Sequence, residues 1–260
     1  MTEEPYRWME AIANRREYIE HQLASGSPIV ALTFKDGILL FTLSRERQKL
    51  FEIYDRIGLG AIGHPGDIER LRMAAIELAS TEGFTRSAQD VSLRRLASYS
   101  LSPALKAAFE QIYGPPYLAR LLFAELGRGS APNQFVRMEY DGSFHTNGGA
   151  FGRTFEDFGT ICGTASAMAL VERFLRERIN REASLEEAVA VAADAWTVGF
   201  LAQRDVDLAE VPAPEVIKRE KTEQIVNAAL EAAVLDRHAT GSVTWRSLQE
   251  AAVRCMLGGR

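Results

Sequence analysis

Residues 26–63, GSPIVALTFKDGILLFTLSRERQKLFEIYDRIGLGAIG, decide the fold of this chain. Two apolar runs, at 29–34 and 38–43, are joined by Lys35-Asp36-Gly37. Asp-Gly between hydrophobic runs predicts a β-hairpin, because glycine adopts a positive φ without steric cost. After a short polar loop, two more strands are predicted before residue 63. The first two runs are nearly continuously apolar, so we expect both faces of their sheet to be covered.

The composition is that of an ordinary globular protein, with 260 residues, 47% hydrophobic and 25% charged. This length is enough for one large domain or two small ones. A net charge of −5 argues against a general nucleic-acid binder. The cysteines, Cys162 and Cys255, form no CxxC pair, which favours a reducing compartment. We find no signal peptide and no segment long and apolar enough to span a membrane, so we expect a cytoplasmic protein that does not act at a membrane.

An N-terminal helix is predicted at 5–24, where a narrow apolar stripe recurs at helical spacing. A stripe this narrow is typical of a helix on a surface or against a neighbouring subunit. Further helices are predicted at 67–81, at 88–113 with a bend near Pro103, at 165–179, at 184–201 and at 246–256. Further strands are predicted at 118–126, 134–140, 158–162 and 230–235.

Two of these segments have clear local signals. Ser184 and Glu187 form a capping box at the start of the 184–201 helix. Residues 204–223 are rich in charges and contain two prolines, which predicts a mobile surface loop. No linker divides the chain, so residues 1–260 are expected to form a single domain. Blocks of strands that alternate with pairs of helices predict an α/β architecture in four layers, α/β/β/α.

The order and spacing of several stretches resemble the proteasome core subunits, which belong to the N-terminal-nucleophile hydrolases. The stretches are ASGSPIVALTFKDGILLF (24–41), QKLFEIYDRIGLGAIG (48–63), IERLRMAAIELASTEGF (68–84), YLARLLFAELG (117–127), MEYDGS (138–143), CGTASAM (162–168) and LEAAVLDR (230–237). The resemblance implies the four-layer α/β/β/α sandwich of that superfamily. It is closest to the bacterial α-type subunits, because the 5–24 helix occupies the place of an N-terminal helix that mature β-type subunits lack.

The resemblance also implies a function. An α-type subunit forms a homo-heptameric outer ring on a ring of β-type subunits, which carry the threonine protease. It gates the entry of unfolded protein substrates and docks a ring-shaped ATPase activator. It would not be an enzyme itself, and it would need no cofactor and no metal.

Lys49 is the main candidate site residue. It aligns with a lysine that lies, in α-type rings, in the pocket between adjacent subunits and meets the C-terminal carboxylate of a docking activator. Gly26 and Gly63 resemble glycines that line the same pocket, where a missing Cβ lets another chain approach. His64 would lie beside them. From spacing alone, Lys49 is more simply an exposed loop lysine beside Arg45 and Arg47, and the family register favours the pocket role.

Ser27 is the candidate in an alternative function. Alignment on Lys35-Asp36-Gly37 puts Ser27 where the β-type nucleophile stands, so the chain could be a self-compartmentalising hydrolase that uses Ser27 after self-cleavage. Such a nucleophile needs its own α-amine as a base, with help from a lysine and an acid. The position of that acid is Leu43 in this register, so the ion pair that would orient the lysine is missing.

A dinucleotide enzyme is a third interpretation. Gly58, Gly60 and Gly63 have the spacing of a dinucleotide fingerprint. A hairpin precedes them where a first βαβ strand should stand, so these glycines more simply continue an apolar strand. The four histidines lack any zinc-binding spacing.

Overall fold

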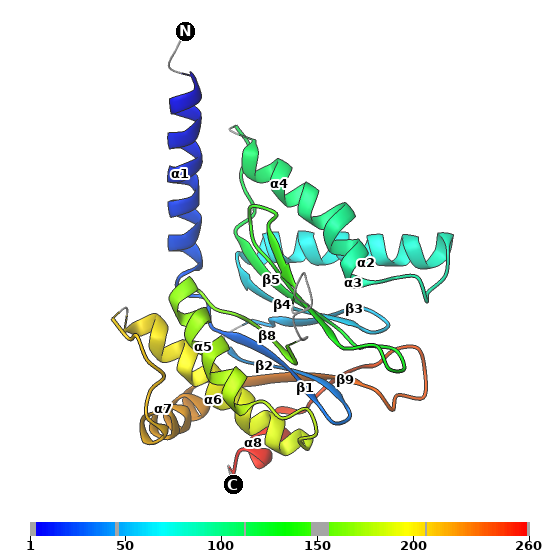
Figure 1. Ribbon diagram of the computed structural model, residues 1–260, viewed down its shortest axis with the longest axis vertical. Coiled ribbons are helices and arrows are strands. Elements are labelled where there is room, and N and C mark those ends of the chain that lie inside the picture. The colour runs from blue at the N-terminus through cyan, green and yellow to red at the C-terminus, as the bar shows by residue number, and fades with distance from the viewer. Residues whose placement is uncertain (1–3, 45–46, 112, 147–155, 206, 259–260) are drawn as a thin grey trace.

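The computed structural model describes residues 4–44, 47–111, 113–146, 156–205 and 207–258. Two antiparallel sheets lie face to face, and helices cover their outer faces (Figure 1). Sheet A contains, in spatial order, β10 (Trp245–Ser247), β9 (Ala229–Asp236), β2 (Gly37–Ser44), β1 (Ile29–Phe34) and β8 (Phe158–Ile161). Sheet B contains β3 (Leu50–Tyr54), β4 (Ile57–Gly63), β5 (Ala119–Glu125), β6 (Gln134–Met138) and β7 (Phe144–Thr146). The strands predicted from the sequence are confirmed, with small shifts of their ends.

The helices form the two outer layers. Sheet B is covered by α2 (Pro65–Thr85), α3 (Leu93–Leu96), the π-helical turn η1 (Ala97–Leu101) and α4 (Ser102–Glu110). On the side of sheet A lie α5 (Ala165–Arg178), α6 (Leu185–Arg204), α7 (Pro214–Asn227) and α8 (Glu250–Met256). The predicted four-layer α/β/β/α sandwich is therefore confirmed. So is the capping box, in which Ser184 and Glu187 satisfy each other's backbone N–H groups at the start of α6.

Strand β1 shows why its sequence is continuously apolar. Val30, Leu32 and Phe34 pack in the cluster under the helices of sheet A, while Ile29 and Ala31 belong to the cluster between the two sheets. Each large apolar side chain buried in this way contributes roughly 1.5–3 kcal/mol. The prediction that both faces of the hairpin are covered is confirmed, because alternate side chains enter two different cores.

The β1–β2 turn is tighter than its sequence signal indicates. Phe34 pairs with Gly37, so the loop consists of Lys35 and Asp36 alone, and Gly37 is already the first residue of β2. A Cβ at Gly37 would lie 1.9 Å from the carbonyl oxygen of Leu235 on the next strand. Glycine is therefore required there by close approach of β9 as well as by the turn.

The N-terminal helix α1 (Glu4–Leu23) is confirmed, and it projects from the body of the molecule (Figure 1). Only its last turns enter the core, where Ile19 and Leu23 are buried between the sheets. Farther up the helix, the Arg15 guanidinium donates hydrogen bonds to the Phe109 and Gln111 carbonyl oxygens, both at 2.9 Å. These are carbonyls at the end of α4 that have no partner within their own helix.

The prediction of a mobile loop at 204–223 is wrong from residue 214 onward, because α7 begins there. Pro214 stands in the first turn of the helix, a position where its missing N–H costs nothing. Ile217 is buried and Ile225 packs on the cluster of sheet A, so α7 is an amphipathic helix with a charged outer face. The charges and prolines that indicated a loop belong to that face and to the helix start.

Two further predicted helices have different bounds. The segment predicted as helix from residue 88 begins only at Leu93, and it passes through the π-helical turn η1 just before Pro103. Residues 245–247, placed at the edge of the last predicted helix, form strand β10 at the edge of sheet A. Among the described residues, no helix has both the length and the apolar character needed to cross a membrane.

Candidate functional site

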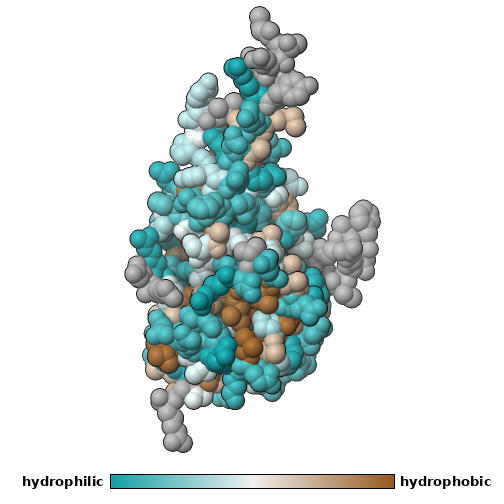
Figure 2. Space-filling model, turned by 90° about the vertical axis from the view of Figure 1, so that its left-hand side faces the viewer, coloured by the Kyte–Doolittle hydropathy of each residue, from teal (hydrophilic) through white to brown (hydrophobic). Residues whose placement is uncertain are grey.

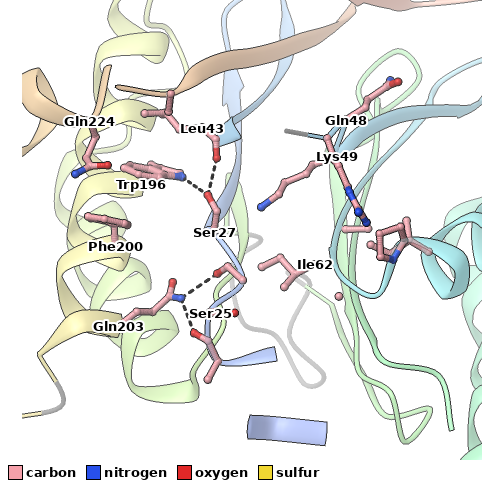
Figure 3. A pocket seen from close by; sticks show the side chains of 18 of the residues that line it. Ser25, Ser27, Leu43, Gln48, Lys49, Ile62, Trp196, Phe200, Gln203 and Gln224 are labelled. Carbon is pink, nitrogen blue, oxygen red and sulfur yellow. Dashed lines mark hydrogen bonds between the residues drawn. The ribbon is translucent and has the colours of Figure 1, made fainter. Parts of the chain in front are cut away.

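A cavity of about 800 Å³ lies where the two sheets and helix α6 meet (Figure 3). Its walls come from the α1–β1 linker, from the loop before β3, from the end of β4 and from the inner faces of α6 and α7. The lining residues used below are Gly26, Ser27, Leu43, Arg47, Lys49, Gly63, Glu69, Trp196, Phe200, Gln203, Arg204 and Gln224. The cavity thus collects segments from both ends of the sequence.

The Ser27 hydroxyl is fully engaged inside this cavity. It donates a hydrogen bond to the Leu43 carbonyl oxygen at 2.6 Å and accepts one from the Trp196 indole N–H at 3.1 Å. Leu43 is the residue that stands where an acid would be needed, and its carbonyl oxygen accepts the hydrogen bond from the Ser27 hydroxyl. The hydroxyl is therefore held by a backbone acceptor and an aromatic donor, with no basic side chain among its hydrogen-bond partners in the described part of the chain.

Lys49 is half-buried, and its side chain points into the cavity toward Ser27 (Figure 3). Within the described residues, its Nζ forms no hydrogen bond and no ion pair. The nearby Glu231 carboxylate accepts the backbone N–H groups of Lys49 at 2.9 Å and Leu50 at 2.8 Å. Burial lowers the pKa of Lys49 to about 8, and the charge of Glu231 offsets only part of this effect. Lys49 is a cation that the chain desolvates without giving it a direct partner.

Gly26 and Gly63 both line the cavity, but the structure gives each an additional reason to be glycine. A Cβ at Gly26 would lie 2.0 Å from Cγ2 of Ile62, and a Cβ at Gly63 would lie 2.0 Å from the carbonyl oxygen of Leu118. Gly63 also has a φ of 134°, which L side chains rarely adopt. Packing within this chain therefore requires both glycines, whether or not another chain approaches them.

His64 directly follows Gly63, but its side chain serves the start of helix α2. It is exposed and caps helix α2, where its Nδ1 accepts the Gly66 backbone N–H at 3.2 Å. It does not belong to the lining of the cavity. The structure thus brings together Lys49, Gly26, Gly63 and Ser27, and it gives His64 a local role at a helix start.

The aromatic wall of the cavity comes from α6. The rings of Trp196 and Phe200 stack with centroids 5.0 Å apart at an angle of 13°. One turn farther along, Gln203 donates from Nε2 to the carbonyl oxygens of Ala24 and Gly26, both at 2.9 Å. Its Oε1 is buried and has no hydrogen-bond partner among the described residues. Helix α6 therefore holds the α1–β1 linker in place while it leaves one acceptor unused.

A family model described as "Proteasome subunit" matches residues 23–206. The chain belongs to the proteasome subunit family. The match begins at the end of α1 and extends past the end of α6, and helix α7 lies beyond it.

Curated relatives of this proteasome subunit are bacterial α subunits. "Proteasome subunit alpha" of Nocardioides sp. is 30% identical over 253 residues, which cover 96% of this chain and 87% of the relative. "Proteasome subunit alpha 2" of Rhodococcus erythropolis is 31% identical over 249 residues, covering 93% and 88%. "Proteasome subunit alpha" of Parafrankia sp. is 33% identical over 192 residues, covering 73% and 74%. The resemblance to bacterial α-type subunits is confirmed.

A buried arginine fixes the base of α1 in this proteasome subunit. Arg120, on β5, is 2% exposed and donates to Glu139 at 2.6 Å, to Glu20 of α1 at 3.2 Å and to the Cys162 carbonyl oxygen at 2.6 Å. Burial alone would lower the pKa of Arg120, but the two carboxylates outweigh it and raise that pKa. Sequence reasoning missed this residue, because an arginine within a predicted apolar strand carries no local sign of its partners.

Proposed function

We propose that this chain is the α-type subunit of a bacterial 20S proteasome core and that it is not itself catalytic. In this proposal it forms a homo-heptameric outer ring on a ring of β-type subunits, which carry the protease. It gates the passage of unfolded protein substrates and docks a ring-shaped ATPase activator in the cytoplasm. The names of the relatives support the assignment to the α type.

The engagement of Ser27 carries the non-catalytic part of the proposal. An N-terminal nucleophile needs a free α-amine beside its hydroxyl. Here helix α1 precedes Ser27, and Gln203 holds the linker that joins them through the Ala24 and Gly26 carbonyl oxygens. The Ser27 hydroxyl donates its hydrogen bond to the Leu43 carbonyl oxygen, which cannot act as a general base. These contacts favour a structural serine over the alternative hydrolase.

Lys49 supports the docking part of the proposal. Its ammonium lies in an apolar-walled cavity without a direct partner among the described residues, where a carboxylate of another chain would find an unpaired cation. A charge-assisted contact of this kind contributes roughly 1.5–3 kcal/mol. Repeated around a ring, the same contact would be strengthened by avidity.

Native mass spectrometry of the chain, alone and co-expressed with a β-type subunit from the same genome, tests the assembly. The proposal expects a full-length chain in seven-membered rings that join an active β ring. A chain that stays monomeric with every β-type partner would contradict it. A product that starts at Ser27 and hydrolyses peptides without a partner would instead establish the alternative hydrolase.

Lys49→Ala tests the docking site separately. We expect binding of the ATPase ring to weaken by at least about tenfold, since a charge-assisted hydrogen bond is lost. The matched control is Lys106→Ala, which removes an exposed lysine from α4. Both variants should form the same rings in native mass spectrometry. Equal ATPase binding by the Lys49→Ala ring and the control ring would show that the docking site lies elsewhere.

A further inference from the structure

We propose that Nζ of Lys49 is a covalent-modification site for aromatic aldehydes, which form an imine with it inside the cavity. The proposal rests on the shape and chemistry of the cavity of this one chain. Nothing in the assembly proposed above requires such a reaction.

The geometry leaves the amine open to a ligand. Figure 3 shows the Lys49 side chain extended into the cavity, with its nitrogen opposite Ser27. Within the described residues Nζ has no hydrogen bond and no ion pair, because the oxygens of Glu231 already accept the backbone N–H groups of Lys49 and Leu50. The Ser27 hydroxyl is held by Leu43 and Trp196, so it does not compete for Nζ.

The opposite wall favours an aromatic ligand. Trp196 and Phe200 form a stacked pair on α6, and the cavity of about 800 Å³ has room for a single aromatic ring beside them. On the side of the body that faces the viewer in Figure 2, an apolar area also interrupts the mostly hydrophilic surface below the projecting helix. An aryl group that enters the cavity would therefore exchange water for apolar and aromatic contacts.

Burial keeps part of the Lys49 amine neutral near physiological pH, and the charge of Glu231 opposes this effect only in part. Arg47, from the loop before β3, and Arg204, from α6, add positive charge to the lining. Glu69, from α2, is paired with Arg72 at 2.7 Å, and Glu231, from β9, lies behind the backbone amides. Because burial lowers its pKa to about 8, about a quarter of Lys49 is uncharged at pH 7.5. For a lysine with an ordinary pKa near 10.4, the uncharged fraction is about one in a thousand.

The reaction needs no further reagent. The lone pair of neutral Nζ attacks the aldehyde carbon, a C–N bond forms, and the carbonyl oxygen takes up the proton lost by nitrogen. The resulting carbinolamine then expels its oxygen as water, and the C=N bond of the imine forms. One aldehyde and one amine thus give one imine and one water, without any change of oxidation state.

A consequence for docking rests on the function proposed above. An imine at Lys49 replaces the ammonium group by a C=N group, and the aryl group attached to it occupies the cavity. The carboxylate of a docking partner would then meet neither the cation nor the space that it needs. Aldehyde modification would in this way block activation of the ring without touching the protease.

The test uses the purified full chain with 4-formylbenzoate and sodium cyanoborohydride, which traps the imine as a stable secondary amine. Peptide mass spectrometry then gives the labelling rate of each lysine between pH 6.5 and 9.5. At pH 7.5 we expect Lys49 to react at least tenfold faster than the exposed lysines Lys106 and Lys218. That ratio should fall as the pH rises above 8. A Lys49 rate equal to or below theirs over the whole range would overturn the proposal.

Three controls separate the cavity from other causes. In urea, Lys49 should react at the rate of Lys106, and persistence of its advantage would show that local sequence rather than the cavity is responsible. Acetaldehyde should show a smaller preference for Lys49 than 4-formylbenzoate does, and equal preference would refute the aromatic part. Lys49→Arg should remove the fast adduct and leave the Lys106 rate unchanged; a fast adduct that persists elsewhere would overturn the assignment.

The labelling is measured on the chain alone, so it does not depend on any partner. Fast labelling of Lys49 together with normal ATPase binding by the labelled ring would refute the docking function and leave the reactive amine established. Slow labelling of Lys49 together with loss of ATPase binding in Lys49→Ala would refute the reactive amine and support the docking function.

Discussion

Arg120 and Lys49 are both cations that the fold withdraws from water, but the chain surrounds them in opposite ways. Arg120 receives Glu20, Glu139 and two backbone carbonyl oxygens as partners, and its pKa is raised. Lys49 faces an open cavity with no direct partner in the described residues, and its pKa is lowered to about 8. The positive charge of Arg120 thus stabilises the fold, whereas that of Lys49 is available to bind a ligand in the cavity.

The difference follows from where each cation stands. Arg120 lies at the junction of α1, sheet B and the loop after β8, where three segments supply acceptors to one planar guanidinium. Lys49 lies at the edge of the cavity, where the neighbouring Glu231 carboxylate is used to hold backbone amides. A charge with several internal acceptors stabilises the fold, while a charge without them costs stability that a ligand can recover.

Removal of Arg120 should have the largest effect. Arg120→Met removes the 2.6 Å partner of the half-buried Glu139 carboxylate, which keeps its 3.5 Å ion pair with Arg137, and it frees the base of α1. We therefore expect a loss of about 3 kcal/mol in the free energy of unfolding. Urea denaturation followed by circular dichroism measures it. The double variant Arg120→Met with Glu139→Gln should recover part of the loss. A loss below about 1 kcal/mol would mean that Arg120 does not fasten the fold.

The α1–β1 linker lies between the helix that Arg120 contacts and the cavity that Lys49 lines. Loss of its contact with α6 should have an intermediate effect on stability. Trp196→Phe keeps an aromatic ring but removes the indole N–H that donates to Ser27, so we expect a loss of about 1 kcal/mol. In hydrogen exchange, the backbone amides near the linker should also exchange faster. Ser27→Ala should lower the free energy of unfolding by less in the Trp196→Phe background than in the wild type. Equal losses in the two backgrounds would show that the two side chains do not interact.

Removal of the Lys49 charge should have the smallest effect and the opposite sign. At pH 7 we expect the free energy of unfolding of Lys49→Met to equal that of the wild type or to be higher by up to about 1 kcal/mol, because the variant lacks a partly desolvated charge. The folded pKa is about 8 and the unfolded pKa is near 10.4, so the unfolded chain binds more protons between these values. The free energy of unfolding of the wild type should therefore rise relative to that of Lys49→Met as the pH rises from 8 to 10.

The control for this pH dependence is Lys106→Met. Lys106 is exposed on α4 and forms a 3.8 Å ion pair with Glu110, so its removal should change stability by less than about 0.5 kcal/mol. The difference between this variant and the wild type should stay constant between pH 8 and 9.5. If Lys49→Met behaves in the same way, the Lys49 ammonium is not desolvated and the comparison with Arg120 fails.

The sequence predicted most of the fold where the signal was local. The β1–β2 hairpin follows from two apolar runs around a two-residue turn, and the start of α6 follows from a capping box within four residues. Helix α7 was missed because its charged outer face and its first-turn proline read as loop signals. Only the burial of Ile217 against sheet A distinguishes it as a helix, and burial against a distant element has no local signature.

The candidate site was predictable only in part. The family register placed Lys49, Gly26, Gly63 and His64 at one docking pocket and Ser27 at an alternative catalytic site. The structure brings Gly26, Ser27, Lys49 and Gly63 to one cavity. The role of Gly26 and Gly63 in docking remains a prediction, and packing against Ile62 and Leu118 already requires both glycines. The role of His64 in docking also remains a prediction, and its side chain already caps helix α2.

Apart from helix α7 and strand β10, the sequence by itself determined most of the order of strands and helices, the covered hairpin and membership of the proteasome subunit family, because these depend on periodicity, turn residues and register along the chain. The tertiary structure alone decided which polar groups meet. Ser27 and Trp196 are 169 residues apart in sequence, and Arg120 and Glu20 are 100 apart. Such pairs form only when the layers pack at one distance and in one register. Packing rather than any local pattern therefore fixed the partners of Arg120 and left Nζ of Lys49 without a direct partner among the described residues.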